Sequence, residues 1–195
     1  MRRLSHDDKA RLHAAIANAE AKTTARIACV VIPASDRYVL YPVLWGAMAA
    51  LVVGAAASLY APHLSMRVGL IVQAIVFAVA TFAYDWFPVR LTLVPKHAKT
   101  SHARNFAHRE FAARILSPVD HREGVLLFVS LGERYVEILG TPGVHKIIGD
   151  AKWNTIVADF TRAAREGRIG DGAIAAIDAC SKDLAAHFPR SGTTA

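Results

Sequence analysis

Two apolar runs in the first half of the chain constrain its fold more than any other feature. Val39–Tyr60 contains 22 residues and Val68–Tyr84 contains 17, and from Tyr38 to Tyr84 the only formal charge is Arg67. A helix of roughly 17 to 25 apolar residues crosses the hydrocarbon core of a bilayer, which is about 30 Å thick. The sequence therefore predicts a transmembrane helical hairpin over residues 38–88, with helices at about 39–60 and 68–87.

A hydrophobic hairpin buried inside a soluble protein is the alternative interpretation of these runs. Hydrophobic residues make up 53% of the chain, which is high for a soluble protein. A soluble core of this size would leave too little polar chain to cover it. Trp86, Phe87 and Pro88 extend the second run past Asp85, so that it is long enough to tilt or to anchor at the interface.

Basic residues on both sides of the hairpin predict its orientation. Residues 1–37 contain seven Lys or Arg against four acidic residues, and residues 85–120 contain six against three. Cytoplasmic flanks carry the excess of Lys and Arg in membrane proteins. We expect a multi-pass protein of the bacterial inner (cytoplasmic) membrane with both termini in the cytoplasm.

Small residues predict how the two helices pack on each other. A ridge of small side chains allows close approach of two backbones in a membrane, and a pore is not expected because neither helix has a charged or broken centre. Gln73 is the one strongly polar side chain within either run, and it could bond across the pair or to a second copy. The expected packing residues are Gly46, Ala50, Gly54 and Ser58 on the first helix, and Ala74 and Ala78 on the second.

The charge distribution argues against nucleic-acid binding. The net charge of +7 is confined to the membrane flanks and the connecting turn, because residues 121–195 contain nine basic and nine acidic residues. A nucleic-acid-binding domain concentrates its positive charge on the folded part. The lipid bilayer is therefore the expected partner of the basic segments.

Helix and strand patterns alternate in the remaining sequence and predict an α/β fold. We expect residues 1–37 to supply the first helix and strand of one domain, residues 89–190 to supply the rest, and residues 191–195 to form a flexible tail. The membrane hairpin would then be an insertion in a loop of that domain. The expected helices are 6–24, 99–116, 150–168 and 170–188, and the expected strands are 25–32, 124–131 and 134–139, the last with one solvated face.

The C-terminal part resembles the TPM domain, a family often labelled as phosphatases that includes a thylakoid-lumen protein of photosystem II repair. The resemblance rests on GVLLFVSLGERYVEILGTPGVHKIIGDAKWNTIVADFTRAAREGRIGDGAIAAIDACSKDLAAHFP at residues 124–189 and on AIANAEAKTTARIACVVI near the N-terminus. It implies an α/β sandwich with a small central sheet. It also implies one of three roles: weak acid phosphatase, divalent-cation binder or adaptor in a membrane complex.

Two departures from the family pattern remove carboxylates. Relatives commonly have Ala-Asp-Arg-Gly after the third strand, where this chain has Gly140, Thr141, Pro142 and Gly143, and Arg26 replaces an acid at the first strand. Mg²⁺ and Ca²⁺ need hard oxygen ligands. These losses weaken the catalytic interpretation.

The remaining candidates for metal binding are acidic residues near the second predicted hairpin strand. Glu133 and Glu137 lie four residues apart, and with Asp150 they could bind Ca²⁺ or Mg²⁺; simple solvation is the alternative. Nine histidines occur, but none forms the helical pair with a nearby acid that a zinc site requires. Gly167, Gly170 and Gly172 are interpreted as a turn between two helices, and Cys29 and Cys180 as reduced, buried thiols.

Two functions remain open. The first is a non-catalytic interaction or assembly module held at the membrane, with a membrane protein or a second copy as partner. The alternative is a weak phosphatase that depends on a divalent metal. We expect no catalytic residue and no cofactor other than such a cation.

Overall fold

The computed structural model describes residues 5–36, 38–60, 65–86, 92–117 and 123–190. The expected tail at 191–195 lies outside these ranges, as do Phe87 and Pro88. The helices are α1 (His6–Lys22), α2 (Leu40–Tyr60), α3 (Met66–Tyr84), α5 (Lys96–Phe111), the π-helix η1 (Ala112–Leu116), α6 (Pro142–Ile148), α7 (Asp150–Arg165) and α8 (Ile169–His187). The strands are β1 (Arg26–Ile32), β2 (Gly124–Ser130) and β3 (Tyr135–Gly140).

The chain divides into two compact units. One unit combines Met1–Ser35 with Ser101–Ala195, and the other is Asp36–Thr100. The first unit contains the sheet and the second contains α2 and α3. The second unit is thus inserted in the chain of the first, after β1 and before residue Ser101 of α5.

A small mixed sheet lies at the centre of the first unit. Its order is β1-β2-β3, with β1 parallel to β2 and β3 antiparallel to β2. All seven residues of the central strand β2 are buried, because a strand covered on both faces has no solvated side. The predicted α/β class is confirmed. The solvated face expected for β3 is not seen, since all six of its residues are half-buried.

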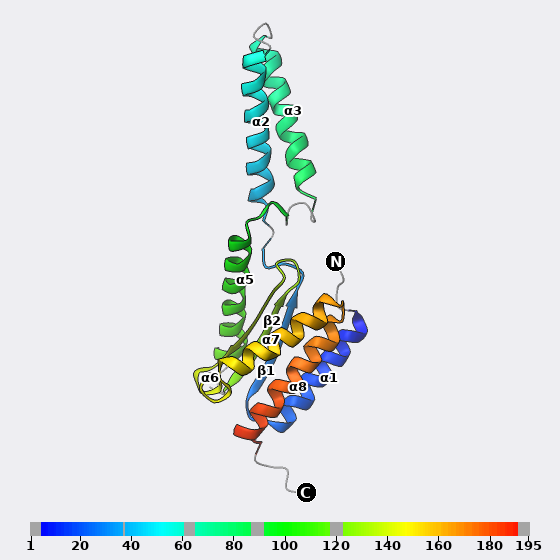
Figure 1. Ribbon diagram of the computed structural model, residues 1–195, viewed down its shortest axis with the longest axis vertical. Helices are drawn as coiled ribbons and strands as arrows, with labels where there is room; N and C mark the ends of the chain where they lie inside the picture. The colour runs from blue at the N-terminus through cyan, green and yellow to red at the C-terminus, as the bar shows by residue number, and fades with distance from the viewer. Residues whose placement is uncertain (1–4, 37, 61–64, 87–91, 118–122, 191–195) are drawn as a thin grey trace. The chain divides into compact units, whose positions relative to one another are not determined.

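Helices α1, α7 and α8 cover one face of the sheet (Figure 1). Alternate residues of β2 point to this face and pack against the apolar sides of these helices. Gly172 in α8 allows a close approach to α7, because a β-carbon there would lie 2.9 Å from the β-carbon of Ala163. The core on this face includes Leu12, Val125, Leu127, Val129, Trp153, Phe160, Ile177 and Leu184.

The opposite face of the sheet packs against α5 and η1. Leu126 and Phe128 of β2 meet Ala103 and Ala107 of α5 in a second apolar cluster. Burying a side chain such as that of Phe128 contributes about 1.5–3 kcal/mol. The two clusters together make β2 the most deeply buried element of the unit.

The end of α5 differs from the continuous helix that we predicted over 99–116. Its last turn is a π-helix, in which the amide of Ser117 donates to the carbonyl of Ala112 at 2.8 Å. Continued α-helical spacing from Ala107 would direct Arg114 toward the sheet. The wider turn instead buries Ile115 and leaves Arg114 exposed.

Helix α1 is held at both of its ends. Thr23, just after α1, donates its hydroxyl to the carbonyl of Phe188 at 2.7 Å and forms a bridge with Pro189. At the other end of α1, Ser5 and Asp8 form a reciprocal capping box, which satisfies two backbone amides of the first turn. The first helix is therefore fixed at its start by its own sequence and at its end by the C-terminal segment.

One local prediction is corrected, and one helix was not predicted. Gly170 and Gly172 lie inside α8, which begins at Ile169, and only Gly167 (φ 82°) belongs to the turn between helices. Sequence reasoning noted the segment after β3 only as a departure from the family pattern and predicted no helix or strand there. This segment forms the short helix α6. Pro142 is its first residue, and proline is favoured there because its missing amide would have no helical partner.

The second unit is an antiparallel pair of apolar helices, α2 and α3. Gly46 of α2 lies against Thr81, and Gly54 lies against the side chain of Gln73, whose atoms would be 3.1–3.2 Å from an added β-carbon. Ala50 between them is buried. These three of the expected packing residues face α3.

The other expected packing residues lie elsewhere. Ser58, Ala74 and Ala78 are exposed, and α3 presents Gln73 and Thr81 to α2 instead. The expectation matched residues by size and ignored helical phase. One step along a helix turns the side chain by about 100°, so Ala74 points well away from the contact made by Gln73.

The outer surface of the hairpin is apolar. No residue of α3 is buried, and Leu51, Val79 and Phe82 expose 61%, 63% and 85% of their surface. By length and composition both α2 and α3 are able to cross a membrane. A solvent-exposed apolar surface of this extent is rare in soluble proteins.

Candidate functional site

Glu133, the first of the predicted metal ligands, lies in the turn between β2 and β3. Its carboxylate accepts hydrogen bonds from the amide and the hydroxyl of Ser35, both at 2.8 Å. It also accepts a hydrogen bond from the hydroxyl of Ser130, which is buried. The carboxylate therefore ties the β2–β3 turn to the segment that follows β1.

Glu137 and Asp150 lie apart from this turn in different surroundings. Glu137 stands opposite Phe128 in the sheet, accepts a hydrogen bond from the hydroxyl of Tyr135 at 3.0 Å and lies 4.0 Å from His108. Burial, and then the neighbouring carboxylate of Glu137, raise the pKa of Tyr135 to about 12. Asp150 begins α7, is 79% exposed and pairs with His145 at 3.1 Å.

The predicted Ca²⁺ or Mg²⁺ site does not fit this donor set. Ca²⁺ takes six to eight oxygen ligands, and protein-bound Mg²⁺ uses at least one or two carboxylates in octahedral geometry. Over the described ranges no group of three His, Cys, Asp or Glu residues could hold a metal ion. The structure does not bring Glu133, Glu137 and Asp150 together.

The end of β3, where the resemblance implies a carboxylate, is occupied by Thr141. Its hydroxyl donates to the carboxylate of Glu123 and accepts from the amide of Gly124 at 3.2 Å. Gly143 lies directly against the same carboxylate. Sequence reasoning missed Glu123, whose position just before β2 was the available signal. This carboxylate is held in a structural hydrogen bond beside the sheet.

Arg26, which replaces an acid at the start of β1, also has a structural partner. Its guanidinium donates to the backbone carbonyl of Arg114 at 3.3 Å. This contact joins the edge strand β1 to the π-helix η1. At both departures from the family pattern, the residue that replaces the acid makes a structural hydrogen bond. Neither Arg26 nor Thr141 offers a carboxylate to a cation.

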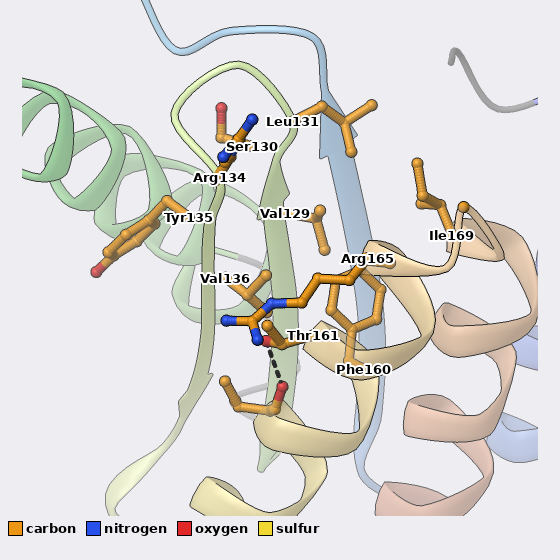
Figure 2. Close-up of a pocket in the computed structure, with 13 residues that line it drawn as sticks. Val129, Ser130, Leu131, Arg134, Tyr135, Val136, Phe160, Thr161, Arg165 and Ile169 are labelled. Carbon is orange, nitrogen blue, oxygen red and sulfur yellow. Dashed lines mark hydrogen bonds between the residues drawn. The ribbon is translucent and has the colours of Figure 1, made fainter. Parts of the chain in front are cut away.

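A cavity of about 740 Å³ lies between the β2–β3 hairpin and α7 (Figure 2). Ligand-binding sites in proteins commonly have volumes of roughly 300–1,000 Å³ and mostly apolar walls. Here Val129, Val136 and Phe160 form an apolar floor, and the turn from Gly167 to Ile169 closes one side. All of these residues belong to the first unit.

Two arginines border this cavity. Arg134 comes from the end of the β2–β3 turn and Arg165 from the last turn of α7, and both are exposed. Figure 2 shows Arg165 extending across the cavity toward β3, whereas the ring of Tyr135 points away. Sequence reasoning missed both residues. That both arginines line one cavity depends on the packing of α7 on the sheet, which the sequence does not show.

Comparison with known proteins places this fold in a family. Residues 87–183 match the TPM domain (TPM phosphatase). The fold is shared with BA42 from the psychrophilic bacterium Bizionia argentinensis, known from an NMR structure. The two chains superpose with a TM-score of 0.56 over 96% of this chain and 86% of BA42, at 14% identity. No curated protein matches the sequence significantly.

Proposed function

Because the chain belongs to the TPM domain family, we propose that it is a membrane-anchored protein that presents its TPM domain at the cytoplasmic face of the bacterial inner membrane. The domain acts there as a non-catalytic interaction or assembly module. A membrane protein or a second copy of the chain is the partner. The apolar outer surface of the α2–α3 hairpin carries this proposal.

The hairpin supports membrane anchoring because its side chains lack a protein environment. In the first unit large apolar residues such as Phe128 and Phe160 are buried, whereas in α3 none is. Lipid chains remove the same apolar area from water as a protein core does. Insertion therefore supplies the burial that the second unit does not provide for itself.

The basic flanks support the cytoplasmic orientation. No acidic residue occurs between Asp85 and Glu110, a stretch that contains Lys96, Lys99, Arg104 and Arg109 of α5. The loop between α2 and α3, in contrast, carries only Arg67 nearby. This asymmetry favours the side with more Lys and Arg as the cytoplasmic one.

The hydrogen bonds of the acids support a non-catalytic role. Glu133 is engaged by Ser35 and Ser130, and Glu123 is engaged by Thr141. Each carboxylate thus stabilises a connection between strands or loops. A metal-dependent hydrolase needs carboxylates that converge on one point with lone pairs available.

Cysteine labelling in intact bacteria tests the orientation. Ser65→Cys, before α3, is expected to react with a membrane-impermeant maleimide in intact cells once the outer membrane is permeabilised. Ala151→Cys, exposed at the start of α7, is expected to react only after lysis. Native Cys29 and Cys180 give a low background because burial raises the pKa of both thiols. Labelling of Ala151→Cys in intact cells, or recovery of the protein in the soluble fraction without detergent, overturns the proposal.

An assay with a chromogenic phosphate ester tests the non-catalytic role separately. The full chain in lipid nanodiscs is expected to release no phosphate above background, with or without Mg²⁺ or Ca²⁺. Turnover that depends on the metal and disappears in Glu133→Gln would replace the module by a phosphatase. Turnover that persists in this variant would point to a contaminating enzyme.

A further inference from the structure

The cavity beside α7 carries two arginines that form no ion pair with a carboxylate of the described residues. Arg134 and Arg165 make no ion pair there, although their neighbours Arg162 and Arg168 pair with Asp159 and Glu166. Among the described residues no Asp or Glu belongs to the cavity lining, although the carboxylate of Glu133 accepts from the hydroxyl of the lining residue Ser130. We propose that this cavity binds a small amphiphilic anion, that is, a carboxylate or phosphate group attached to an apolar body.

The positions of the two guanidinium groups account for the anionic part of the ligand. Guanidinium presents several N–H donors in one plane and binds carboxylate or phosphate oxygens in pairs. Arg134 approaches from the β2–β3 turn and Arg165 from α7 (Figure 2). An anion between them receives donors from two separate elements, and the apolar floor lies beneath it.

The floor of the cavity accounts for the apolar body. Val129, Val136 and Phe160 line it, and these side chains cannot satisfy a fully hydrated ion. The hydroxyl of Thr161, also in the lining, already donates to the carbonyl of Val157 at 2.7 Å. A volume of about 740 Å³ exceeds what an inorganic anion fills. The cavity therefore has room for an apolar group of the size of a phenyl ring.

The backbone of Arg134 provides an independent observation. Its φ of 53° lies in the left-handed region, which is unfavourable for a residue with a β-carbon and is usually occupied by Gly, Asn or Asp. A strained residue at a cavity is a recurrent property of binding sites. At this position the chain has an arginine, although Gly, Asn or Asp would adopt the left-handed backbone conformation at a lower cost in free energy.

Binding of matched small molecules to the full chain in lipid nanodiscs tests the proposal. The probes are 4-phenylbutyrate, its uncharged analogue 4-phenylbutan-1-ol, phenyl phosphate and inorganic phosphate, with empty nanodiscs as the blank for partitioning. Binding is read from the methyl NMR signals of Val129, Val136 and Ile169. We expect 4-phenylbutyrate, phenyl phosphate or both to shift these signals. The alcohol and inorganic phosphate should bind at least roughly tenfold more weakly.

Three single variants locate the binding site. Arg165→Gln and Arg134→Asn are each expected to weaken binding of the anionic probe roughly tenfold, because each removes a hydrogen bond between charged groups. Arg162→Gln, three residues from Arg165 on α7 but outside the cavity lining, is expected to leave binding unchanged. Arg134→Asn should also keep or raise the Tm, since Asn tolerates the left-handed backbone.

The outcomes separate cleanly. Binding of one anionic probe alone supports the proposal and identifies the anionic group. Equal binding of the alcohol shows a merely apolar hollow and overturns it. Unchanged affinity in both Arg134→Asn and Arg165→Gln, or no binding by either anionic probe, also overturns it. None of these results depends on the orientation of the hairpin, so a failure here leaves the proposed membrane function standing.

Discussion

Strand β2 and helix α3 are both built of apolar residues, yet they have opposite surroundings. Every residue of β2 is buried, between α1, α7 and α8 on one face and α5 with η1 on the other. No residue of α3 is buried, and among the described helices it packs on α2. Composition alone therefore does not show where apolar side chains find a water-free environment.

The difference between them lies in which backbone groups are satisfied within the element. A strand needs neighbours for its hydrogen bonds, so β2 can be apolar only inside a sheet. A helix satisfies its own backbone and can stand in hydrocarbon with one partner. The first unit supplies its apolar residues with protein contacts, whereas the second leaves most of them exposed, and this exposure is the basis of the proposed membrane insertion.

The largest expected effect comes from the same truncation in the two surroundings. Phe160→Ala should cost about 3–5 kcal/mol in unfolding free energy, because this residue is 2% exposed in the core between α7, α8 and the sheet. Phe82→Ala, on the 85% exposed outer side of α3, should change the stability of the TPM domain by less than about 0.5 kcal/mol. Urea unfolding in nanodiscs, monitored by hydrogen exchange of the β2 amides, measures the unfolding free energy of both variants. Equal losses would erase the distinction.

The next effect tests whether the hairpin has an interior of its own. Gly46→Leu should disrupt the contact of α2 with Thr81 at a cost of about 1–3 kcal/mol, because it inserts a side chain where a β-carbon already clashes. Gly69→Leu is the matched control on α3, since no atom lies within 4 Å of its added β-carbon. Spin labels at exposed Leu51 and Ile75 report the interhelical distance. A distribution that is unchanged in Gly46→Leu would contradict the packing described above.

A smaller effect is expected at the turn between β2 and β3. Glu133→Gln should lower stability by about 1 kcal/mol, because hydrogen bonds from Ser35 and Ser130 lose a charged acceptor. Glu166→Gln, which removes the exposed partner of Arg168, should have almost no effect. Thermal unfolding with and without millimolar Ca²⁺ measures both variants and the parent. A Tm that rises with Ca²⁺ only in the parent would restore Glu133 as a metal ligand.

The smallest effect concerns the two thiols of the first unit and appears only at high pH. Burial raises the pKa of Cys29 and of Cys180 from 9.0 to about 12. Well below pH 9 both thiols are mostly protonated whether or not the chain is folded, so they hardly affect stability. As the pH rises from 9 toward 12, ionisation favours the unfolded chain and stability falls.

Alkylation kinetics with iodoacetamide measure the same thiols. At pH 8 the thiolate fraction should be roughly a thousandfold lower in the folded than in the unfolded protein. Cys180 should react more slowly than Cys29, which is only partly covered. Rapid alkylation of Cys180 in the folded protein would show that this side of the sheet opens readily.

Local patterns were sufficient to predict most helices and strands. Ser5 with Asp8 predicts the start of α1, and the apolar runs predict α2, α3 and β2 within a few residues. The sequence did not reveal the π-helix at Ala112–Leu116. That turn depends on which side chain packs against the sheet. The spacing of residues along one helix does not contain this information.

The candidate site was less predictable than the fold. Glu133 and Glu137 are close in sequence, but a turn residue and a strand residue do not share a face here. Arg134 and Arg165 are 31 positions apart in the chain and line one cavity only because α7 packs on the hairpin. Charges that converge through tertiary packing leave no spacing pattern to detect.

The parallel pairing of β1 with β2 also sets an order for biosynthesis. Arg26 pairs with Gly124, so the ribosome must add almost a hundred residues after the first strand before its neighbour exists. At roughly 5–20 residues per second this interval lasts about 5–20 s. Both apolar helices emerge during that time. The sheet therefore forms only after α2 and α3 have been synthesised, and the membrane insertion proposed above has this interval in which to occur.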